Sequence, residues 1–245
     1  MSESKKEKKK KGGILWKIVL IIAIIVFAVS AGVLINHWWT GHQDEQNFEE
    51  LKVNGGHDLA KLHAQNSDIV GWIKIPNTRV DYPVMQTPND NEYYLRRNFK
   101  KEYSVAGTPF MDAQSVIGTS QNYLIFGHNM KNGTMFHDIL KYEDKDFWEK
   151  NRTITFDMLD GNHKYRVVAA FRSQIYKKSS KKFKYYSYAS ITDKETYDTY
   201  VTNVKQLCSY DTGVTPEYGQ QLITLSTCAY HVDDGRFALV AVQVD

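Results

Sequence analysis

The sequence has few cysteines, which limits the fold and the chemistry that it can encode. Only Cys208 and Cys228 occur in 245 residues, too few for a scaffold held together by disulfides. A disulfide between the two would also consume the thiol best placed for catalysis, so we expect two free cysteines. The chain lacks internal repeats as well, and its one low-complexity stretch is a lysine-rich tail at the N-terminus.

Beyond this tail, the chain has no excess of positive charge. The formal net charge of the whole sequence is +3. Seven lysines and two glutamates up to Lys17 contribute +5, which leaves −2 for the rest of the chain. The positive balance is therefore a property of the tail and gives no support for a nucleic-acid partner.

A long apolar run follows the lysines. Residues 18–35 contain only apolar and small side chains, and this length is that of a membrane-spanning helix. Trp38 and Trp39 come next, as aromatic residues do at a membrane interface. Lysines before the run and few after it predict a cytoplasmic N-terminus and an extracellular remainder. The alternative is a cleavable signal peptide, with the small residues 28–30 as its cleavage site.

Strand patterns dominate the chain from residue 69 onward. A polar segment comes first, in which Phe48, Leu51, Leu59 and Leu62 indicate short helices, or otherwise a flexible stalk. Asp160-Gly161 is typical of a hairpin turn. The apolar and β-branched runs predict strands at residues 69–75, 80–84, 123–126, 153–158, 165–176, 222–225 and 237–244.

One long helix is predicted over residues 193–209. Thr192 would cap its N-terminus, with Glu195 completing a capping box. Because Cys208 lies on the apolar face, we expect it to be a core residue without a catalytic role. The predicted apolar face consists of Tyr197, Tyr200, Val201, Val204, Leu207 and Cys208.

Residues 222–244 place a cysteine and an arginine between two strand-like runs. The turn at Asp233-Asp234-Gly235 predicts a tight reversal, with Gly235 supplying a positive φ. Cys228 then ends one strand and Arg236 opens the next, so that both face one cleft. A cysteine attacks as a thiolate, which a nearby cation favours. A guanidinium also stabilises the oxyanion formed on an acyl carbon. The ordinary alternatives are a buried thiol and a surface ion pair.

His128 is the best candidate for the acid that this chemistry needs. It follows the apolar run at residues 123–126 and is flanked by Gly127 and Asn129. A structural histidine satisfied by the backbone is the alternative. Cys228 and His231 have the spacing of a metal-binding pair, but the sequence offers no second close pair, so we expect no metal.

These residues resemble the signature of the sortases, the cysteine transpeptidases of Gram-positive surfaces. The resemblance covers residues 68–245 and points to class B. It is carried by TLSTC at residues 224–228, Arg236, GHN at residues 127–129, and further blocks at residues 68–73, 81–86, 90–95 and 110–112.

The resemblance implies a mainly β fold. It would be a closed sortase-type β-barrel of about eight strands, with N-terminal helices and a long helix inserted between late strands. With the apolar run, it divides the chain into a basic cytoplasmic tail (1–13), a transmembrane signal-anchor helix (14–36), a juxtamembrane helical segment (37–66) and the catalytic barrel (67–245).

The resemblance also implies a reaction that needs no cofactor. Cys228 would attack the carbonyl of a Thr in the C-terminal sorting motif of a surface protein. His128 would serve as acid and base, and Arg236 would stabilise the oxyanion. The acyl group would pass to an amine of a peptidoglycan precursor.

Substrate contacts are implied at six positions, and one nearby residue departs from the family pattern. Phe126 stands two residues before His128, where a relative has Tyr, so a hydroxyl contact is not expected there. Asn91 and Leu95 would line the groove, Ser226 and Thr227 would touch the sorting motif, and Tyr188 and Ile191 would form the other wall.

Three other functions use the same features. A pilin-joining sortase would differ only in its acceptor. A cell-wall or papain-like cysteine hydrolase would place its cysteine at a helix start and before the histidine, whereas His128 precedes Cys228 here. A membrane-tethered binding module would need no chemistry at all.

Overall fold

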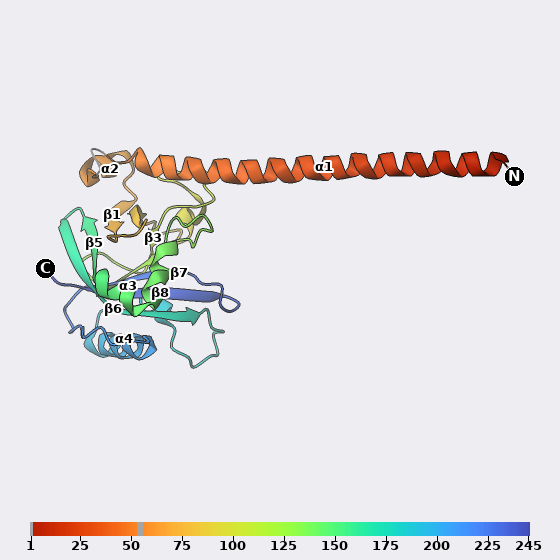
Figure 1. The fold of residues 1–245 in the computed structure, drawn as a ribbon. Helices are drawn as coiled ribbons and strands as arrows, with labels where there is room; N and C mark the ends of the chain where they lie inside the picture. Colours follow the sequence, from red (N-terminus) through yellow and green to blue (C-terminus); the bar gives the residue numbers. More distant parts are fainter. Residues whose placement is uncertain (1, 53–55) are drawn as a thin grey trace. The chain divides into compact units, whose positions relative to one another are not determined.

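The computed structural model describes residues 2–52 and 56–245, and within its first helix it describes side chains only for residues 15–33 and 45–49. The chain forms two compact units, residues 1–43 and residues 44–245. Figure 1 gives the order of the elements along the chain. Each unit is described by itself.

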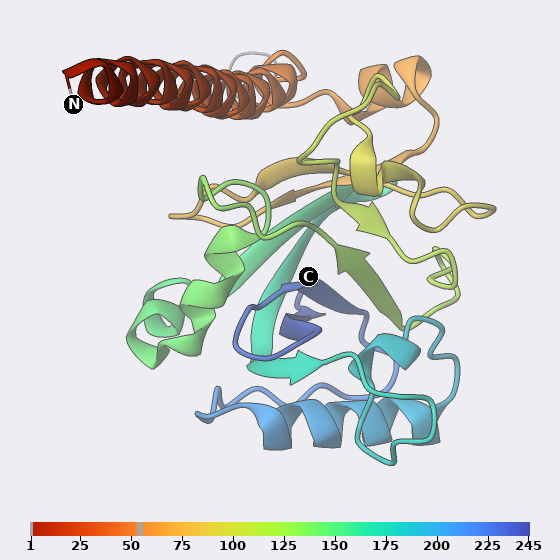
Figure 2. The same ribbon diagram turned by 90° about the vertical axis from the view of Figure 1, so that its right-hand side faces the viewer.

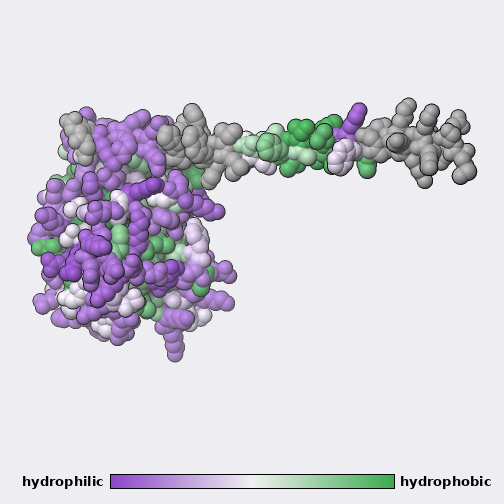
Figure 3. All heavy atoms as spheres, viewed as in Figure 1, coloured by the Kyte–Doolittle hydropathy of each residue, from purple (hydrophilic) through white to green (hydrophobic). Residues whose placement is uncertain are grey.

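The first unit is helical and belongs to α1 (Ser2–Glu49). Its segment Leu15–Val33 has 19 residues and is long and apolar enough to cross a membrane. Figure 3 shows hydrophobic side chains along this part of the helix. The predicted interfacial residues Trp38 and Trp39, and the lysines of the tail, lie outside the residues whose side chains are described.

In the second unit, the eight strands that the described residues form close into a barrel. Figure 2 shows how these strands are arranged. The strand order around the barrel is β1-β2-β3-β4-β7-β8-β6-β5. The pairs β2–β3 and β4–β7 are parallel, and the others are antiparallel. The strands are β1 (Ile69–Lys74), β2 (Asp81–Met85), β3 (Phe110–Met111), β4 (Asn122–Phe126), β5 (Thr153–Met158), β6 (Gly161–Gln174), β7 (Leu222–Cys228) and β8 (Gly235–Gln243).

Apart from α2 and the end of α1, which precede β1, the helices of the second unit lie in the segments between the strands. The long helix α4 is inserted between β6 and β7, and the whole agrees with the predicted mainly β barrel. Figures 1 and 2 both show α4 beside β6. The helices of this unit are α2 (Leu59–Gln65), η1 (Tyr93–Arg96), η2 (His137–Glu143), α3 (Lys145–Lys150), η3 (Tyr185–Ser187) and α4 (Lys194–Leu207).

Helix α4 begins at Lys194, one residue later than predicted. Asp193 is the N-cap, because its carboxylate accepts a hydrogen bond from the backbone N–H of Thr196 at 2.8 Å. The prediction of Thr192 is therefore wrong. Leu207 is also wrongly placed on the apolar face, since it lies in the last turn and is 45% exposed. Cys208 is half-buried against the core under the helix, as predicted.

Residues 237–242 of β8 form a continuous apolar run, and both faces of the strand are buried there. Phe237 and Leu239 point into the core of the barrel, whereas Ala238 and Val240 pack in the second core under α4. A strand buried on both sides is expected to be a continuous hydrophobic run. Side chains two residues apart in a strand share a face. Arg236, at the beginning of β8, therefore lies on the same face as Ala238 and Val240.

The segment before the barrel packs on it. Phe48, Leu51 and Leu62 are buried in the same core as the inner strand residues. The rings of Phe48 and Tyr82 meet edge to face with centroids 5.1 Å apart. Within the second unit, this segment is therefore a helical part of the domain and not a flexible stalk.

Candidate active site

Cys228 and Arg236 face each other at the end of the β7–β8 pair that the connecting turn closes. They are direct partners in the antiparallel register. The next pair, Ala229 and Gly235, is joined by a backbone hydrogen bond of 2.9 Å, which makes Cys228–Arg236 a pair without ladder bonds, the type in which side chains lie closest. The β-carbons of such partners lie about 4.5–5.5 Å apart on one face of the sheet. The thiol and the guanidinium therefore share a face.

The turn between the two strands holds this pair in a way that the sequence did not predict. Asp234, and not Gly235, has the positive φ, at 53°. Gly235 is required for a different reason, because a β-carbon there would lie 2.0 Å from the carbonyl oxygen of Ala229. The absence of a side chain at Gly235 lets the two strands approach each other immediately beside Cys228 and Arg236.

His128 arrives from the strand on the other side of β7. The parallel register of β4 and β7 ends at Phe126 and Ser226, so the continuing chain brings His128 level with Cys228. Two hydrogen bonds hold this extension: the Gly127 N–H donates to the Ser226 carbonyl at 3.1 Å, and the Thr227 hydroxyl donates to the Gly127 carbonyl at 2.6 Å. The structure thus brings the three predicted catalytic residues to one end of β4, β7 and β8.

The imidazole of His128 is oriented by a backbone carbonyl. Its Nε2 lies 2.9 Å from the carbonyl oxygen of Leu95. Because a carbonyl only accepts, Nε2 carries the proton and Nδ1 is the free atom of the neutral ring. Burial lowers the pKa of His128; the Leu95 carbonyl opposes this shift, and the charge of Arg96 adds to it. His128 is therefore neutral at neutral pH.

Tyr185 lies near the cysteine and the arginine and was not predicted. Its hydroxyl is 2.7 Å from the Ser226 hydroxyl, and burial raises its pKa to about 12. Both Arg236 and Cys228 act on this pKa, in opposite directions, so both lie within electrostatic range of the ring. Tyr185 is separated from Ser226 by 41 residues, so no local sequence pattern connects the two.

Three of the predicted substrate residues, Leu95, Ser226 and Thr227, lie around this end of the barrel, whereas Asn91 is held by Asp112 beside the middle of β4. Leu95 supplies the carbonyl that holds His128. Ser226 and Thr227 are 1% and 3% exposed, and their hydroxyls bind Tyr185 and Gly127. The Asn91 amide donates to the Asp112 carboxylate at 3.1 Å.

The structure does not bring Tyr188 and Ile191 to the cysteine. The Tyr188 carbonyl accepts from the Asn122 amide at 2.9 Å, and the Ile191 carbonyl accepts from the Gln121 N–H at 2.6 Å. Asn122 pairs with Leu222 at the beginning of β7, whereas Cys228 is at the end of that strand. Ile191 is 1% exposed in the core under α4.

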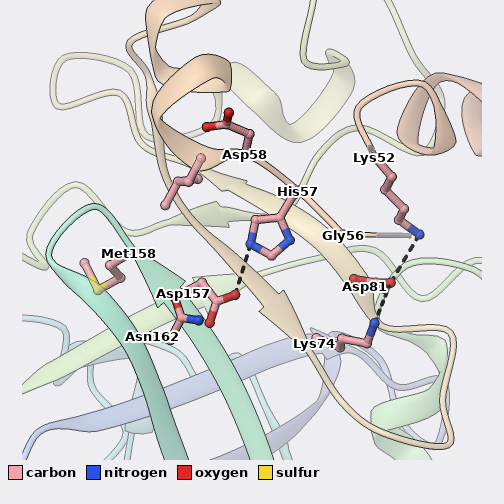
Figure 4. A pocket seen from close by; sticks show the side chains of 10 residues that line it. Lys52, Gly56, His57, Asp58, Lys74, Asp81, Asp157, Met158 and Asn162 are labelled. Atoms are coloured by element: carbon pink, nitrogen blue, oxygen red, sulfur yellow. Dashed lines mark hydrogen bonds and ion pairs between the residues drawn. The ribbon is translucent and has the colours of Figure 1, made fainter. Parts of the chain in front are cut away.

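A second polar cluster lies on another side of the barrel, in a pocket of about 550 Å³ next to β1 and β5. Figure 4 shows His57 pointing toward Asp157, and Lys52 and Lys74 pointing toward Asp81. His57 binds Asp157 at 3.0 Å, and Lys52 binds Asp81 at 3.2 Å. Its acids and bases compensate each other, and in the described residues no group of three or more candidate ligands could hold a metal ion.

Known proteins with sequences similar to this chain are sortases. A family model described as the sortase domain matches residues 73–244. Sortase B of Listeria monocytogenes is 35% identical over 172 residues, which are 70% of this chain and 67% of the relative. Sortase B of Staphylococcus aureus is 27% identical over 239 residues, which are 92% of this chain and 93% of the relative.

The fold agrees with the same family. The structure of a Staphylococcus aureus sortase B–substrate complex matches with a TM-score of 0.67 and 28% identity, over 76% of this chain and 84% of that one. The eight-stranded closed barrel found in the described residues is the architecture that the resemblance predicted. The chain therefore belongs to the sortase family of cysteine transpeptidases, and it resembles sortase B in particular.

Proposed function

We propose that this sortase cleaves the C-terminal sorting motif of surface proteins after Thr and joins the new carboxyl end to an amine of a peptidoglycan precursor. The observation that carries the proposal is the direct pairing of Cys228 with Arg236 beside the chain segment that bears His128. A nucleophile, a fixed cation and a titratable group at one place are the set that acyl transfer needs.

In the first step, the Cys228 thiolate attacks the carbonyl carbon of the Thr. The carbonyl oxygen becomes an oxyanion, which the Arg236 guanidinium stabilises by hydrogen bonds and charge. The C–N bond then breaks while protonated His128 donates a proton to the departing amine. Since Nε2 is held by Leu95, the proton leaves from Nδ1. The product is a thioester on Cys228 and a neutral imidazole.

In the second step, the acceptor amine attacks the thioester. Nδ1 of neutral His128 takes a proton from the amine, and Arg236 again stabilises the oxyanion. The C–S bond breaks, the Cys228 thiolate is restored, and the acyl group leaves as a new amide. Because burial lowers the pKa of His128, only a minor part of the imidazole is protonated at neutral pH, and we expect slow turnover.

The location of the enzyme follows from its apolar helix. We propose a basic cytoplasmic tail at residues 1–13, a membrane anchor at 14–36, a juxtamembrane helical segment at 37–66 and an extracellular catalytic domain at 67–245. The apolar segment Leu15–Val33 supports the anchor, and the lysines before it support this orientation. Protease added to intact cells digests the barrel if the orientation is right and spares it if the orientation is reversed.

A peptide assay with the full chain in detergent micelles tests the reaction. Sorting-motif peptides are incubated with and without an amine acceptor, and the products are identified by mass spectrometry. An amide product that requires the amine supports the proposed transfer. Cleavage that ignores the amine indicates a hydrolase, and no turnover of any peptide in a library indicates a binding module.

A further inference from the structure

One side chain joins the loop after β4 to the cysteine end of β7. The Asn129 Nδ2 donates to the carbonyl oxygen of Cys228 at 2.9 Å. In the ladder of β4 and β7, the N–H of Gly127 donates to the Ser226 carbonyl, so a continuing parallel ladder would use the backbone N–H of residue 129 for Cys228. The Asn129 amide takes the place of that donor where β4 has already ended.

The orientation of this amide is fixed by His137. The Asn129 Oδ1 lies 2.7 Å from Nδ1 of His137. Because the Cys228 carbonyl can only accept, the NH2 group of Asn129 must face Cys228, and its oxygen must face His137. His137 therefore donates from Nδ1, which is the opposite tautomer from that of His128, whose Nε2 donates to Leu95.

The same loop holds His128 itself. Its carbonyl accepts a hydrogen bond from the backbone N–H of Phe136 at 2.9 Å, and Asn129 pairs with Met135 in an isolated bridge. Met135 and Phe136 are 1% and 0% exposed, so this part of the loop is anchored in the core. Asn129 thus connects a rigid loop bearing the general acid to the backbone of the nucleophile.

We propose that Asn129, oriented by His137, is a positioning residue that sets the placement of Cys228 relative to His128. This inference rests on the proposed function, because it concerns the geometry of the acyl-transfer step. Asn129 contacts the backbone of Cys228 and takes no part in the bonds that form and break. Its loss leaves the thiol, the imidazole and the guanidinium present but misplaced, and a misplacement of about 1 Å lowers a rate by about 100-fold.

Variants of the full chain in detergent micelles test the inference with a sorting-motif peptide and an amine acceptor. We expect Asn129→Ala to lower kcat by about 10- to 100-fold with KM changed less than about threefold, because substrate binding is intact. Asn129→Asp behaves similarly, since a carboxylate cannot donate to the Cys228 carbonyl. Asn132→Ala is the matched control, because among the described residues the Asn132 side chain binds only Thr134, within the same loop. It keeps kcat within about twofold.

Substitutions of His137 provide a second, independent test of the inference. His137→Phe removes the donor to Asn129 and lowers kcat, whereas His137→Gln retains an amide donor and restores kcat toward that of the wild type. In the Asn129→Ala background, His137→Phe has no further effect, because residues that act through one contact are not additive. Nitrogen NMR of labelled histidine shows neutral His137 protonated at Nδ1 in the wild type and a changed tautomer balance in Asn129→Ala.

The outcomes separate this inference from the proposed function. If Asn129→Ala and Asn132→Ala have the same kcat while the wild type forms the amide product, the positioning role is wrong and the proposed function stands. An equal loss in His137→Gln and His137→Phe, or additive losses in the double variant, overturns the role of His137. If the wild type transfers no acyl group to any amine, the proposed function fails and the inference fails with it.

Discussion

Two polar clusters of the second unit differ in how their charges are compensated. In the cluster at β1 and β5, Lys52 and Lys74 both bind Asp81, at 3.2 and 3.3 Å, and His57 binds Asp157. These charges satisfy one another. The cluster joins the segment before the barrel to β1 and β5, and we infer that it serves the fold.

The cluster at the end of β7 is built in the opposite way. The guanidinium of Arg236 donates to the backbone carbonyl of Gly235 at 3.0 Å, and in the part of the chain that the structure describes it forms no ion pair with a carboxylate. His128 is likewise held by a carbonyl. A cation without a counter-ion beside a thiol is available to a developing oxyanion, whereas a paired cation is already neutralised. Compensation, and not the mere presence of charge, distinguishes the two clusters.

The first prediction removes the uncompensated cation. Arg236→Gln is expected to lower kcat/KM by about 10²–10³-fold, because the oxyanion loses its charged donor. Arg172→Gln is the matched control: Arg172 lies on the neighbouring strand β6, but Glu143 binds it through two hydrogen bonds of 2.5 and 2.6 Å. Steady-state kinetics should show near-normal activity for the control. Equal losses in both variants would contradict the comparison.

The second prediction displaces the cation without removing it. Gly235→Ala puts a β-carbon 2.0 Å from the Ala229 carbonyl, so the turn must shift and Arg236 with it. We expect kcat/KM to fall by about 10- to 100-fold. Asp234→Gly in the same turn relieves a positive φ of 53° and should leave kcat/KM within about twofold. Full activity of Gly235→Ala would show that the close approach of β7 and β8 at Gly235 is not needed for activity.

The third prediction concerns the acid limb of the pH profile. Burial and Arg96 lower the pKa of His128, so the acid limb of kcat/KM is expected below the ordinary histidine value of about 6.5. Arg96→Gln removes the charge and moves the limb upward, whereas Arg97→Gln, whose guanidinium lies 4.1 Å from the Tyr93 ring centroid, leaves it in place. A limb that responds equally to both substitutions would exclude the role of Arg96.

The same shift predicts how stability depends on pH. Because the pKa of His128 is lower in the folded state, the unfolded chain binds the proton first. The free energy of unfolding therefore decreases as the pH falls below about 6.5. Denaturant titrations of the wild type and of His128→Gln should show a weaker decrease in the variant over this range.

The fourth prediction breaks the compensated cluster. His57→Leu removes the hydrogen bond to Asp157 and the stacking on Trp72, whose ring centroid is 4.5 Å away. We expect the free energy of unfolding to fall by about 1–2 kcal/mol and kcat to stay within about twofold. Denaturant titration and kinetics on one preparation decide the matter. A loss of kcat without a loss of stability would place His57 in the reaction instead.

The strands beside the site could be predicted because their patterns are local. Burial on both faces makes residues 237–242 of β8 a continuous apolar run. Cys228 was expected at the end of β7 and Arg236 at the beginning of β8, and the structure places them there. The strand β3 was missed, because it has two residues and exists only through its pairing with Met85 and with β4. A strand so short has no pattern of its own.

The contacts that complete the site are long-range and could not be predicted. Leu95 holds His128 across 33 residues, and Asn129 reaches Cys228 across 99. The role of Gly235 was also misjudged, because a sequence can suggest a turn but does not show which residue has the positive φ or how closely two backbones approach. Such errors arise where tertiary packing decides the local conformation.

The most direct test of the central claim is the mass of the acyl-enzyme. The full chain in detergent micelles is mixed with a sorting-motif peptide, stopped in acid, digested and examined by mass spectrometry. We predict an adduct of the peptide up to its Thr on Cys228, present in Cys208→Ala, absent in Cys228→Ala and released by hydroxylamine as a thioester. An adduct that persists in Cys228→Ala, or that maps to Cys208, would contradict the assignment of the nucleophile.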